Sequence, residues 1–556
     1  MKIEGKNIGA DRRRALQMML GVGAGIAVPA HLWAQARGPA APRRRPYVTP
    51  EPTPPHHSIA GGFVPSAISG VFDVRAFGAR GDGRTLDTPA INRAIEAAAT
   101  AGGGTVRFPA GTYLCFSIHL KSHVALYLDQ GATILAAETP EGGVGGYDAA
   151  EPNAWDKYQD FGHSHWHNGL MWGEEIEDVS ILGPGLIWGK GLTRGRRERG
   201  AGVGDKAISL KNCHNVTLRD ISILHGGHFG VLATGVDNLC IDNLKIDTNR
   251  DGIDIDCCRN VRVLNCSVNS PWDDGICPKS SFALGYPRPT ENLTITNCYV
   301  SGSFQEGTLL NGTFMQFDPS FRVPRTGRIK CGTESNGGFK NITISNCVFD
   351  GCRGLALESV DGALIEDVSI SNLTMRDVVE MPIFMRLGSR LRGPSGIPVG
   401  QLRRVNISNI VVSNTDTRFA SILSGIPGHE IEDVRLSNIT ILQQGGGTKE
   451  EATLQPPEKE NAYPEPNMFG PLPAYGFYIR HVKGLEMSNI EVSYMKEDLR
   501  PAFVLNDVKG ADFIHIKAQR AAGGPAFALN SVSDFNLYMS RPLADAHLET
   551  VEQHNL

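Results

Sequence analysis

The stretch from Asn215 to Val268 reads NVTLRDISILHGGHFGVLATGVDNLCIDNLKIDTNRDGIDIDCCRNVRVLNCSV and contains one short pattern three times. NVTLRDISI begins at Asn215, NLCIDNLKI at Asn238 and NVRVLNCSV at Asn260, so that successive copies start 22 to 23 residues apart. In each copy, alternating apolar residues lie on both sides of a turn that carries Asn or Asp, which favour tight bends. The pattern therefore predicts a repeated unit of strand, turn and strand.

Related strings continue this pattern along most of the chain. They are DVSILGPGLI from Asp178, NLTITNCYV from Asn292, NITISNCVF from Asn341, DVSISNLTM from Asp367, RVNISNIVV from Arg404, DVRLSNITI from Asp433 and GLEMSNIEV from Gly484. A period of this size without helices indicates a β-solenoid, in which each coil stacks on the next and buries one continuous core. Leucine-rich repeats are the main alternative, but the regular leucine frame that they need is absent. We therefore predict a parallel β-helix.

Two segments depart from the repeats. Residues 87–101 predict a helix, with Asp87 or Thr88 as its N-cap. A helix placed before the first coil would cover the open end of the solenoid. Residues 443–475 are rich in Gly, Glu and Pro and predict a long loop between two coils near the other end. The solenoid and its cap are expected to form a single domain over residues 69–556.

The N-terminal residues have the pattern of an export signal. Three arginines, residues 12–14, precede an apolar segment over residues 18–30, and Ala34-Gln35-Ala36 follows. This order is typical of a bacterial twin-arginine signal, assigned here to residues 1–36. A membrane anchor is the alternative, but the apolar run is shorter than the roughly 20 residues that span a bilayer. Residues 37–68 predict a flexible leader, and we expect a periplasmic or secreted protein.

Composition and charge exclude several classes of partner. The chain has 556 residues, 41% of them hydrophobic, and a formal net charge of −5. A charge this weak gives no basis for binding nucleic acid or a membrane surface, and we expect no membrane insertion. A solenoid with capped ends is compatible with a monomer, which is the expected state.

The cysteines follow the repeat. Of the 11 cysteines, Cys213, Cys266, Cys298 and Cys347 each come directly after an asparagine, most of them at the same place in the pattern. This placement predicts small buried side chains in the core in place of disulfides. The alternative is a redox-active pair at Cys257-Cys258.

Five aspartates lie within the segment Asn249–Cys277, at positions 251, 254, 256, 273 and 274. Asp251 and Asp273 are 22 residues apart, about one coil, which predicts that they lie on neighbouring coils roughly 4.8 Å apart. Asp251, Asp273 and Asp274 would then form one carboxylate cluster. From the residues alone the cluster fits a calcium site or the acid and base of glycoside hydrolysis. Asp254 and Asp256 are expected mainly to cap backbone amides in turns.

The order of short motifs resembles that of glycoside hydrolase family 28, the polygalacturonase-like enzymes. Asn249-Arg250-Asp251 stands for the family's N-T-D, Asp273-Asp274 for D-D and Arg328-Ile329-Lys330 for R-I-K, from about Phe72 to the C-terminus. The resemblance implies a right-handed parallel β-helix that hydrolyses pectic polysaccharide with inversion at the anomeric carbon. It implies an acidic, plant-type polysaccharide as the partner and no cofactor.

The resemblance also implies roles for the residues. Asp273 would be the general acid, while Asp251 and Asp274 would activate the water. Acid and base are expected about 6.5 to 9.5 Å apart in an inverting enzyme. Arg328 and Lys330 would hold the carboxylate of a uronic acid, with Lys279 in support.

Two departures from the family pattern indicate a divergent member. The G-H-G motif is missing, and Glu306 stands about where its histidine would be. Arg250 occupies the place of a small threonine. A divergent member fits rhamnogalacturonan or a decorated pectin better than plain homogalacturonan. Glu306 and His228 are candidate substrate-binding residues.

The segment GHSHWHNG carries His163, His165 and His167. In a strand these three imidazoles would share one face and could bind a transition metal. A sugar-contacting loop or plain surface is the alternative, and we expect no metal.

Two other functions remain open at this point. One is a pectate-lyase-type eliminase, which also uses a β-helix but relies on calcium and an arginine base. The other is a non-catalytic glycan-binding solenoid, because solenoids carry many functions.

Overall fold

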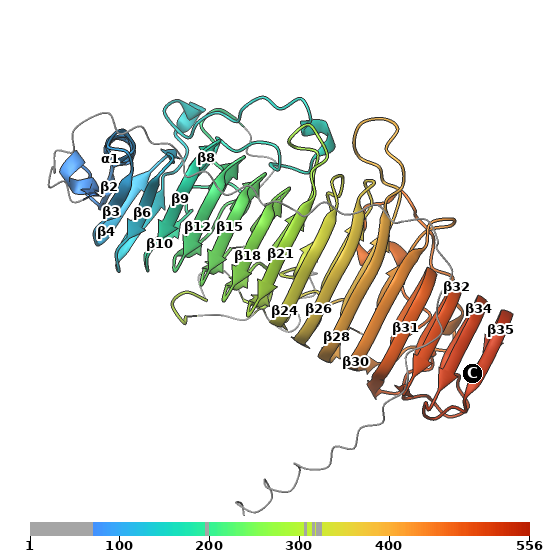
Figure 1. Ribbon diagram of the computed structural model, residues 1–556. Coiled ribbons are helices and arrows are strands. Elements are labelled where there is room, and N and C mark those ends of the chain that lie inside the picture. The colour runs from blue at the N-terminus through green and yellow to red at the C-terminus, as the bar shows by residue number, and fades with distance from the viewer. Residues whose placement is uncertain are drawn as a thin grey trace, which may run out of the picture. The chain divides into compact units, whose positions relative to one another are not determined.

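The computed structural model describes residues 70–194, 200–248, 250–304, 309–313, 317, 325–416 and 418–556. Residues Ile68–Leu556 form one compact unit, distinct from Met1–Ala67. The predicted export signal and leader lie outside the described residues. The described chain forms a right-handed parallel β-helix, which confirms the predicted fold (Figure 1).

Within the described residues the strands form one sheet of six strands and one of 29. The six-stranded sheet contains β5 (Ile118–His119), β8 (Gly169–Glu174), β11 (Lys206–Lys211), β14 (Phe229–Thr234), β17 (Asp251–Asp256) and β20 (Ile276–Lys279). The large sheet begins with β1 (Val71–Asp73), β2 (Asp82–Leu86), β3 (Gly104–Phe108), β4 (Gly111–Cys115), β6 (Val124–Leu128), β7 (Ala132–Ala136), β9 (Glu177–Leu182), β10 (Leu186–Trp188), β12 (His214–Arg219), β13 (Ser222–Leu224), β15 (Asp237–Asp242), β16 (Lys245–Asp247), β18 (Arg259–Leu264), β19 (Ser267–Asn269), β21 (Thr290–Thr296) and β22 (Tyr299–Ser301). It continues with β23 (Lys330–Cys331), β24 (Phe339–Asp350), β25 (Leu355–Ser359), β26 (Leu364–Arg376), β27 (Ile383–Leu387), β28 (Gln401–Thr415), β29 (Ser421–Ser424), β30 (Ile431–Gly445), β31 (Phe477–Lys496), β32 (Phe503–Ile514), β33 (Lys517–Ala518), β34 (Phe527–Tyr538) and β35 (Ala546–Asn555).

Identical positions of successive repeats stack in register and build the core. Val216 on β12 pairs with Leu239 on β15, which pairs with Val261 on β18, and all three side chains are buried. Side chains alternate across a strand, so the apolar set points inward while its polar neighbours face outward. From β24 onward the two strands of a coil merge, since β24 pairs with both β21 and β22.

The first asparagine of each repeat lies near the start of its strand. Asn238, Asn260 and Asn292 have φ of 57°, 56° and 56°, a left-handed conformation that asparagine tolerates better than most residues. Each side-chain amide donates to the asparagine one coil earlier, as from Asn260 to Asn238 at 3.2 Å and from Asn292 to Asn260 at 3.0 Å. The repeated Asn therefore forms a ladder that runs along the stack.

The ends of the solenoid are covered. The predicted helix is present as α1 (Thr88–Thr100), and its face formed by Ala90, Ile91 and Ala94 is buried in the core. Asp87 stands at the N-cap position without a cap hydrogen bond, because its carboxylate accepts from the backbone amides of residues 80 and 81. At the other end β35 pairs antiparallel with β34.

The cysteines are unpaired, as the repeat predicts. All 11 are free, and ten are buried while Cys240 is half-buried. Cys257 and Cys258 point to different partners, since Cys257 Sγ contacts the Ser281 carbonyl and Cys258 Sγ contacts the Ala233 carbonyl. The cysteines therefore behave as compact core residues.

Irregular segments of the solenoid are concentrated in a few connections. Residues 137–168 precede β8 and contain 3₁₀ turns at Glu141–Gly143 and Asp156–Tyr158. Residues 446–476 form the predicted long loop between β30 and β31, with 3₁₀ turns at Glu451–Thr453 and Pro466–Phe469. A further 3₁₀ turn, Val74–Phe77, follows β1. Among the described residues, no helix has the length and apolar character needed to cross a membrane.

Candidate active site

The aspartate-rich strand β17 lies in the six-stranded sheet between β14 and β20. Its register pairs Ile253 with Val231 and Asp254 with Leu232 on β14. Ile253 belongs to the hydrophobic core, and because side chains alternate along a strand, Asp254 lies on the outer face of the sheet. The strand therefore carries apolar residues for the core and carboxylates for the outside.

Asp251 and the Asp273-Asp274 pair lie on consecutive coils, as the sequence spacing predicts. The Gly252 amide donates to the Asp274 carbonyl oxygen at 3.0 Å, which joins the two coils. One carboxylate oxygen from each of the three aspartates lies within 4.8 Å of the others. These selected oxygens are therefore closer than the about 6.5 to 9.5 Å expected between the acid and base groups of an inverting enzyme. Stacked strands are about 4.8 Å apart, and this spacing sets the distance between the acids.

A column of glycines lies beside these acids. A Cβ on Gly252 would stand 2.4 Å from the carbonyl oxygen of Gly275, and one on Gly230 would stand 2.6 Å from that of Gly252. A Cβ on Gly275 would in turn stand 2.9 Å from the carbonyl oxygen of Gly327. The glycines let consecutive coils pack backbone against backbone, so the backbone determines the spacing of the carboxylates.

Asp274 is buried and bound by two cations from the following coil. Arg328 Nε lies 2.9 Å from one carboxylate oxygen, and Lys330 Nζ contacts the other. Burial alone would raise the pKa of Asp274, but Lys330 and Arg328 outweigh it and hold the pKa well below its usual range. Asp274 therefore carries a negative charge at neutral and mildly acidic pH.

Arg328 and Lys330, the predicted ligands for a uronic acid, are enclosed by protein. Their side chains are only 1% and 4% exposed. Besides Asp274, the Arg328 guanidinium lies 3.3 Å from a Glu465 oxygen and 3.7 Å from a Glu358 oxygen. In this structure the two cations therefore balance the charges of the protein's own carboxylates.

Asp251 lies among other acids, whereas Asp274 is bound by cations. Burial raises the pKa of Asp251 well above its usual range, and repulsion from Asp254 and Asp273 raises it further. Its Oδ1 atom has no hydrogen-bond partner among the described residues. Two carboxyl groups on adjacent coils, Asp251 and Asp274, therefore differ in protonation because one faces acids and the other faces cations.

His228, a candidate substrate-binding residue, faces Asp251 from the preceding coil. Its Nε2 atom lies 4.0 Å from Asp251 Oδ2, and its Nδ1 atom lies 3.2 Å from the Arg194 carbonyl oxygen. A carbonyl only accepts, so Nδ1 carries the proton of the neutral ring. Burial lowers the pKa of His228 well below its usual range, and Arg250 lowers it further. The two pKa shifts therefore favour an unprotonated His228 Nε2 facing a neutral Asp251 carboxyl.

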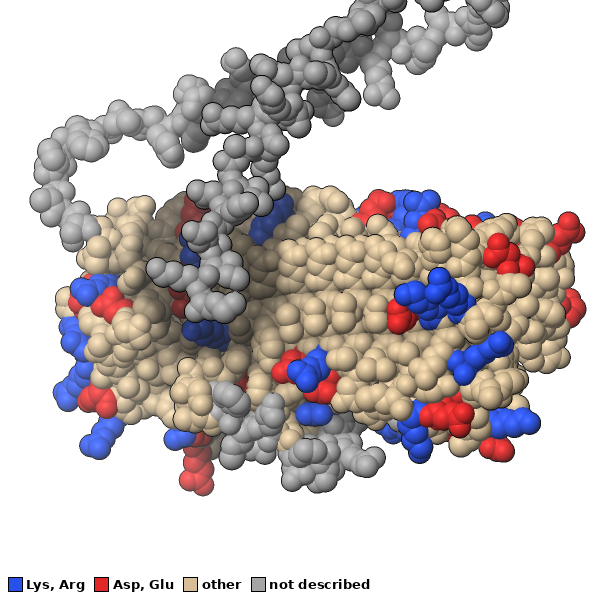
Figure 2. Space-filling model, turned by 90° about the horizontal axis from the view of Figure 1, so that it is seen from below, with Lys and Arg blue, Asp and Glu red and all other residues tan. Residues whose placement is uncertain are grey.

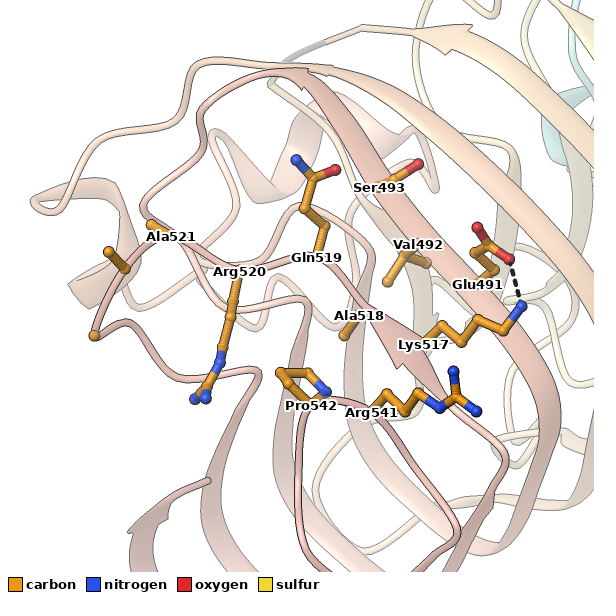
Figure 3. Close-up of a pocket in the computed structure, with 12 residues that line it drawn as sticks. Glu491, Val492, Ser493, Lys517, Ala518, Gln519, Arg520, Ala521, Arg541 and Pro542 are labelled. Carbon is orange, nitrogen blue, oxygen red and sulfur yellow. Dashed lines mark hydrogen bonds and ion pairs between the residues drawn. The ribbon is translucent and has the colours of Figure 1, made fainter.

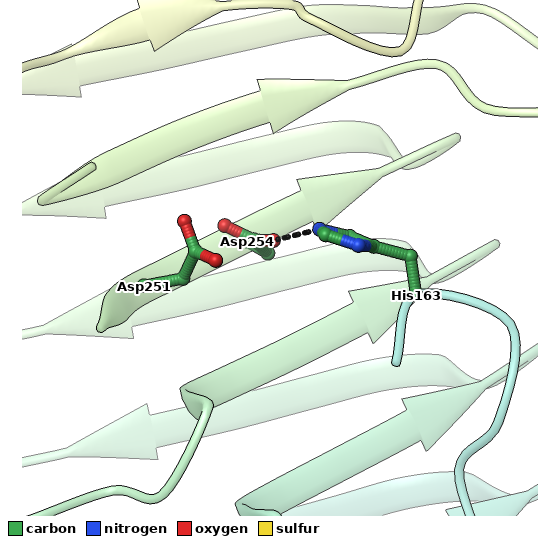
Figure 4. A group of neighbouring side chains, drawn as sticks. All are labelled: His163, Asp251 and Asp254. Carbon is green, nitrogen blue, oxygen red and sulfur yellow. Dashed lines mark hydrogen bonds and ion pairs between the residues drawn. The ribbon is translucent and has the colours of Figure 1, made fainter. Parts of the chain in front are cut away.

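A second buried cluster surrounds Asp254. His163 Nε2 lies 3.1 Å from Asp254 Oδ2 and 3.6 Å from Glu334 Oε2, and Lys279 Nζ lies 3.8 Å from the same Asp254 oxygen. Figure 4 shows the imidazole reaching Asp254 beside Asp251. Burial lowers the pKa of His163, but Glu334 and Asp254 outweigh it and the pKa is raised. Lys279, a predicted substrate ligand, is thus tied into this cluster.

The turn-capping role expected for Asp254 and Asp256 holds for only one of them. Asp256 accepts from the backbone amide of Ser281 at 2.8 Å and from its hydroxyl at 2.6 Å. Asp254 pairs with His163, a side chain from a distant loop, and the expectation for Asp254 is wrong. The reason is its place in mid-strand, where no local backbone amide is available to cap.

The three histidines of GHSHWHNG lie in a loop that ends before β8, so the strand considered for them is not formed. His163 contacts Asp254, His165 Nε2 lies 3.1 Å from Asp156, and His167 Nε2 lies 2.7 Å from Glu174. Because the side chains diverge to separate carboxylates, the three do not form a common metal site. His163 is the member that joins the aspartate cluster, a role that the sequence analysis missed.

Two groups of side chains are close enough to share a cation. One is His163 with Asp251 and Asp254, and the other is Asp251 with Asp273 and Asp274. Lys279 lies against Asp254 in the first group, and two further cations bind Asp274 in the second. Buried ammonium and guanidinium groups thus already supply the positive charge that a divalent ion would bring. These donor sets do not fit a metal centre.

Asp273 and Arg250 form the exposed edge of the cluster. Arg250 Nη2 lies 2.7 Å from Asp273 Oδ2, and the two side chains are 34% and 25% exposed. Asn249 and Glu306, which the sequence analysis also singled out, lie outside the described residues. The contact of Glu306 with substrate remains a prediction.

The loop 446–476 returns to the same region from the C-terminal coils. Glu465 binds both Arg328 and Arg353, and the Tyr463 hydroxyl lies 3.2 Å from Thr333 Oγ1. The composition of residues 443–475 predicts a loop but carries no signal for these contacts.

Two other surfaces of the described chain differ from this cluster. On the face seen in Figure 2, acidic and basic side chains are interspersed, without a field of one sign. A groove of about 640 Å³ near the C-terminal coils is lined by Lys517, Arg520 and Arg541 (Figure 3). Among the described residues that line it, Glu491 is the one carboxylate, and it is ion-paired with Lys517 at 3.1 Å. The groove therefore lacks the paired acids of the Asp251 region.

Fold and cluster together define the class of the protein: a right-handed parallel β-helix that carries three carboxylates close together on two consecutive coils. Comparison with known families agrees with this class. Residues 71–154 match the family described as "Rhamnogalacturonase A/epimerase, pectate lyase-like", and residues 199–321 match "Right handed beta helix region".

Individual proteins with similar sequences or structures give more detail than the family matches. A probable polygalacturonase of Vitis vinifera is 25% identical over 389 residues, which cover 66% of this chain and 73% of the relative. The exo-poly-alpha-D-galacturonosidase of Dickeya chrysanthemi is 25% identical over 382 residues, 58% of each chain. The structure of the Yersinia enterocolitica Family 28 exopolygalacturonase superimposes with a TM-score of 0.57 at 18% identity, covering 81% of this chain and 79% of that one. The structural likeness supports the fold, and the sequence relatives support a pectinase-like, pectin-degrading glycoside hydrolase in general.

Proposed function

We propose that the protein is an inverting glycoside hydrolase that cleaves polygalacturonan or rhamnogalacturonan. The observation that carries this proposal is the cluster of Asp251, Asp273 and Asp274 across two coils. Glycoside hydrolysis needs one protonated and one ionised carboxyl group beside the scissile bond. The raised pKa of Asp251 and the lowered pKa of Asp274 support such a division.

In the proposed reaction, Asp273 donates a proton to the glycosidic oxygen as the bond from the anomeric carbon to that oxygen breaks. Water attacks the anomeric carbon from the opposite face and loses its proton to Asp274, with Asp251 orienting the water. Asp273 is the most exposed of the three acids, which supports its contact with a leaving oxygen. The role of Asp274 is supported by its ionised state.

Asp251 is the rival proton donor, because its raised pKa favours the protonated form in the free protein. The pH dependence of kcat/KM separates the two assignments. Loss of the donor removes the alkaline limb of the profile. If Asp251→Asn removes that limb and Asp273→Asn keeps it, the donor is Asp251.

The substrate part of the proposal includes Lys279, His228, Glu306, Arg328 and Lys330 as residues that shape the binding site. The buried cations among them act through the carboxylates that they contact. We also propose export to the periplasm or the cell exterior, where a pectic polymer is accessible.

The test is release of reducing ends from polygalacturonan and from rhamnogalacturonan by the wild type and by Asp273→Asn. We expect release from one polymer, a loss of at least a hundredfold in the variant, and no rise in ultraviolet absorbance. Asp256→Asn is the matched control, because this aspartate lies on β17 but its carboxylate binds Ser281. Nuclear magnetic resonance of the first product then gives the anomer, and retention would contradict the inverting mechanism.

Two results would refute the proposal. A rise in ultraviolet absorbance with product formation would indicate an eliminase. Tight binding of either polymer without release of reducing ends would indicate a glycan-binding solenoid.

A further inference from the structure

Among the described residues, four lysine and arginine side chains are ion-paired with Asp254, Asp273 or Asp274, and they differ in accessibility. Lys279, Arg328 and Lys330 are each at most 4% exposed. Arg250 is 34% exposed. A polymer that approaches the cluster from solvent therefore meets Arg250 first.

Arg328 and Lys330 also already have carboxylate partners within the protein. Arg328 faces three carboxylates within 3.7 Å, of which Asp274 is the nearest at 2.9 Å. Lys330 contacts the other oxygen of the same Asp274 carboxylate. For either cation to bind a uronic acid, the substrate would have to displace a buried carboxylate, which is costly in a dry site.

Arg250 has one carboxylate partner among the described residues, Asp273. A guanidinium offers five N–H donors in a planar fork, so one partner leaves capacity for a second anion. The backbone of Arg250 is held in place, because Ser270 Oγ contacts the Arg250 carbonyl at 2.5 Å and the Asp273 carbonyl at 3.0 Å. Arg250 and the candidate acid are thus presented together at the mouth of the cluster.

We propose that Arg250 binds the carboxylate of the uronic acid beside the scissile bond and thereby selects acidic over esterified sugar. The inference rests on the proposed function and specifies the group that the site recognises. Because Arg250 touches Asp273, a carboxylate held by Arg250 places the adjoining glycosidic oxygen near that acid. The selectivity then comes from an arginine at the position where family 28 enzymes usually carry a small residue.

The test compares oligogalacturonides with their methyl esters, which are equal in length but uncharged. In Arg250→Gln we expect kcat/KM for the acidic oligomer to fall roughly ten- to a hundredfold through a rise in KM, since a charge-assisted hydrogen bond is lost. For the ester we expect a change of at most about threefold. Arg250→Lys keeps the charge and is expected to recover part of the selectivity.

Arg403→Gln is the matched control. The Arg403 side chain is 33% exposed and lies 3.0 Å from Glu366, so it copies the exposure and pairing of Arg250 on a distant coil. We expect wild-type selectivity in this variant. Equal losses on acid and ester in Arg250→Gln would overturn the inference, because they would show that Arg250 acts only through Asp273.

Calorimetry with the same oligomers separates this inference from the proposed function. If the wild type binds the acidic oligomer without cleaving it, hydrolysis fails while a tenfold weaker affinity in Arg250→Gln still supports carboxylate binding. Unchanged affinity in the variant would refute the role of Arg250. If the wild type binds neither oligogalacturonides nor rhamnogalacturonan oligomers, both proposals are refuted.

Discussion

Replacing Glu358 by glutamine is expected to make the stability of the protein less dependent on pH. Glu358 lies on β25, beside the strand that carries Lys330, and its side chain is fully buried. Neither carboxylate oxygen has a hydrogen-bond partner among the described residues, and Arg328 lies 3.7 Å away. Burial raises the pKa of Glu358 from 4.5 to about 7, although Lys330 and Arg328 oppose the rise.

Proton linkage gives the direction in which the free energy of unfolding changes with pH. Between pH 4.5 and about pH 7 the folded protein holds a proton on Glu358 that the unfolded chain has released. The folded state therefore binds more protons, and the free energy of unfolding decreases as pH rises through this window. At about 1.4 kcal/mol per pKa unit, the contribution of Glu358 falls by about 3 kcal/mol and is fully lost above pH 7.

The assay is urea unfolding followed by circular dichroism from pH 4.5 to pH 8. Because glutamine is always neutral, Glu358→Gln should match the wild type at pH 4.5 and exceed it by up to about 3 kcal/mol at pH 8. Glu366→Gln is the control. Burial raises the pKa of Glu366, but Arg403 and Arg404 outweigh burial and hold this pKa below its usual range. The control should keep the wild-type slope above pH 5. If Glu358→Gln left the pH dependence of the free energy of unfolding unchanged, the conclusion that Glu358 is buried as a neutral carboxyl would be refuted.

Substitutions at Gly252 and Asn292, each with a control variant, test how consecutive coils stack. Gly252→Ala places a Cβ 2.4 Å from the Gly275 carbonyl oxygen, so we expect about 1 to 3 kcal/mol of destabilisation in urea and a marked loss of hydrolysis. Gly200→Ala, with open space around its Cβ, should behave as the wild type in both assays. Asn292→Ala removes a 3.0 Å bond to Asn260 from a residue at φ 56°, and we expect a loss of about 1 to 3 kcal/mol in urea unfolding. Asn292→Gly should lose less, and equal losses would contradict a conformational role for this asparagine.

The fold could be predicted because the coil period is present in the chain itself. Each left-handed asparagine near the start of a strand, such as Asn238 or Asn260, marks one coil, and stacking in register follows from the repeat. The neighbouring positions of Asp251 and Asp273 followed from the same period. The stacked-strand spacing of roughly 4.8 Å agrees with how close the carboxylate oxygens lie, whereas the wider spacing implied by the family resemblance does not describe these oxygens.

Contacts made by loops could not be predicted from the repeat. His163 and Asp254 are 91 residues apart, and Glu465 and Arg328 are 137 residues apart. An irregular loop has no periodicity, so its composition indicates that it is a loop but not which coil it reaches. The histidines were visible in the sequence, yet their alternation suggested a strand that the loop does not form.

The solenoid explains how adjacent, chemically identical side chains acquire opposite protonation states. Asp274 receives its cations from the next coil, where Arg328 and Lys330 flank an apolar residue, whereas Asp251 has Asp254 on its own strand and Asp273 on the neighbouring coil. The order of coils therefore sets the charge around each acid. A motif read along the chain names the residues but not their neighbours across coils. For this reason the family resemblance implied that Arg328 and Lys330 bind the substrate, while the structure joins them to Asp274 and leaves Arg250 as the cation that solvent reaches.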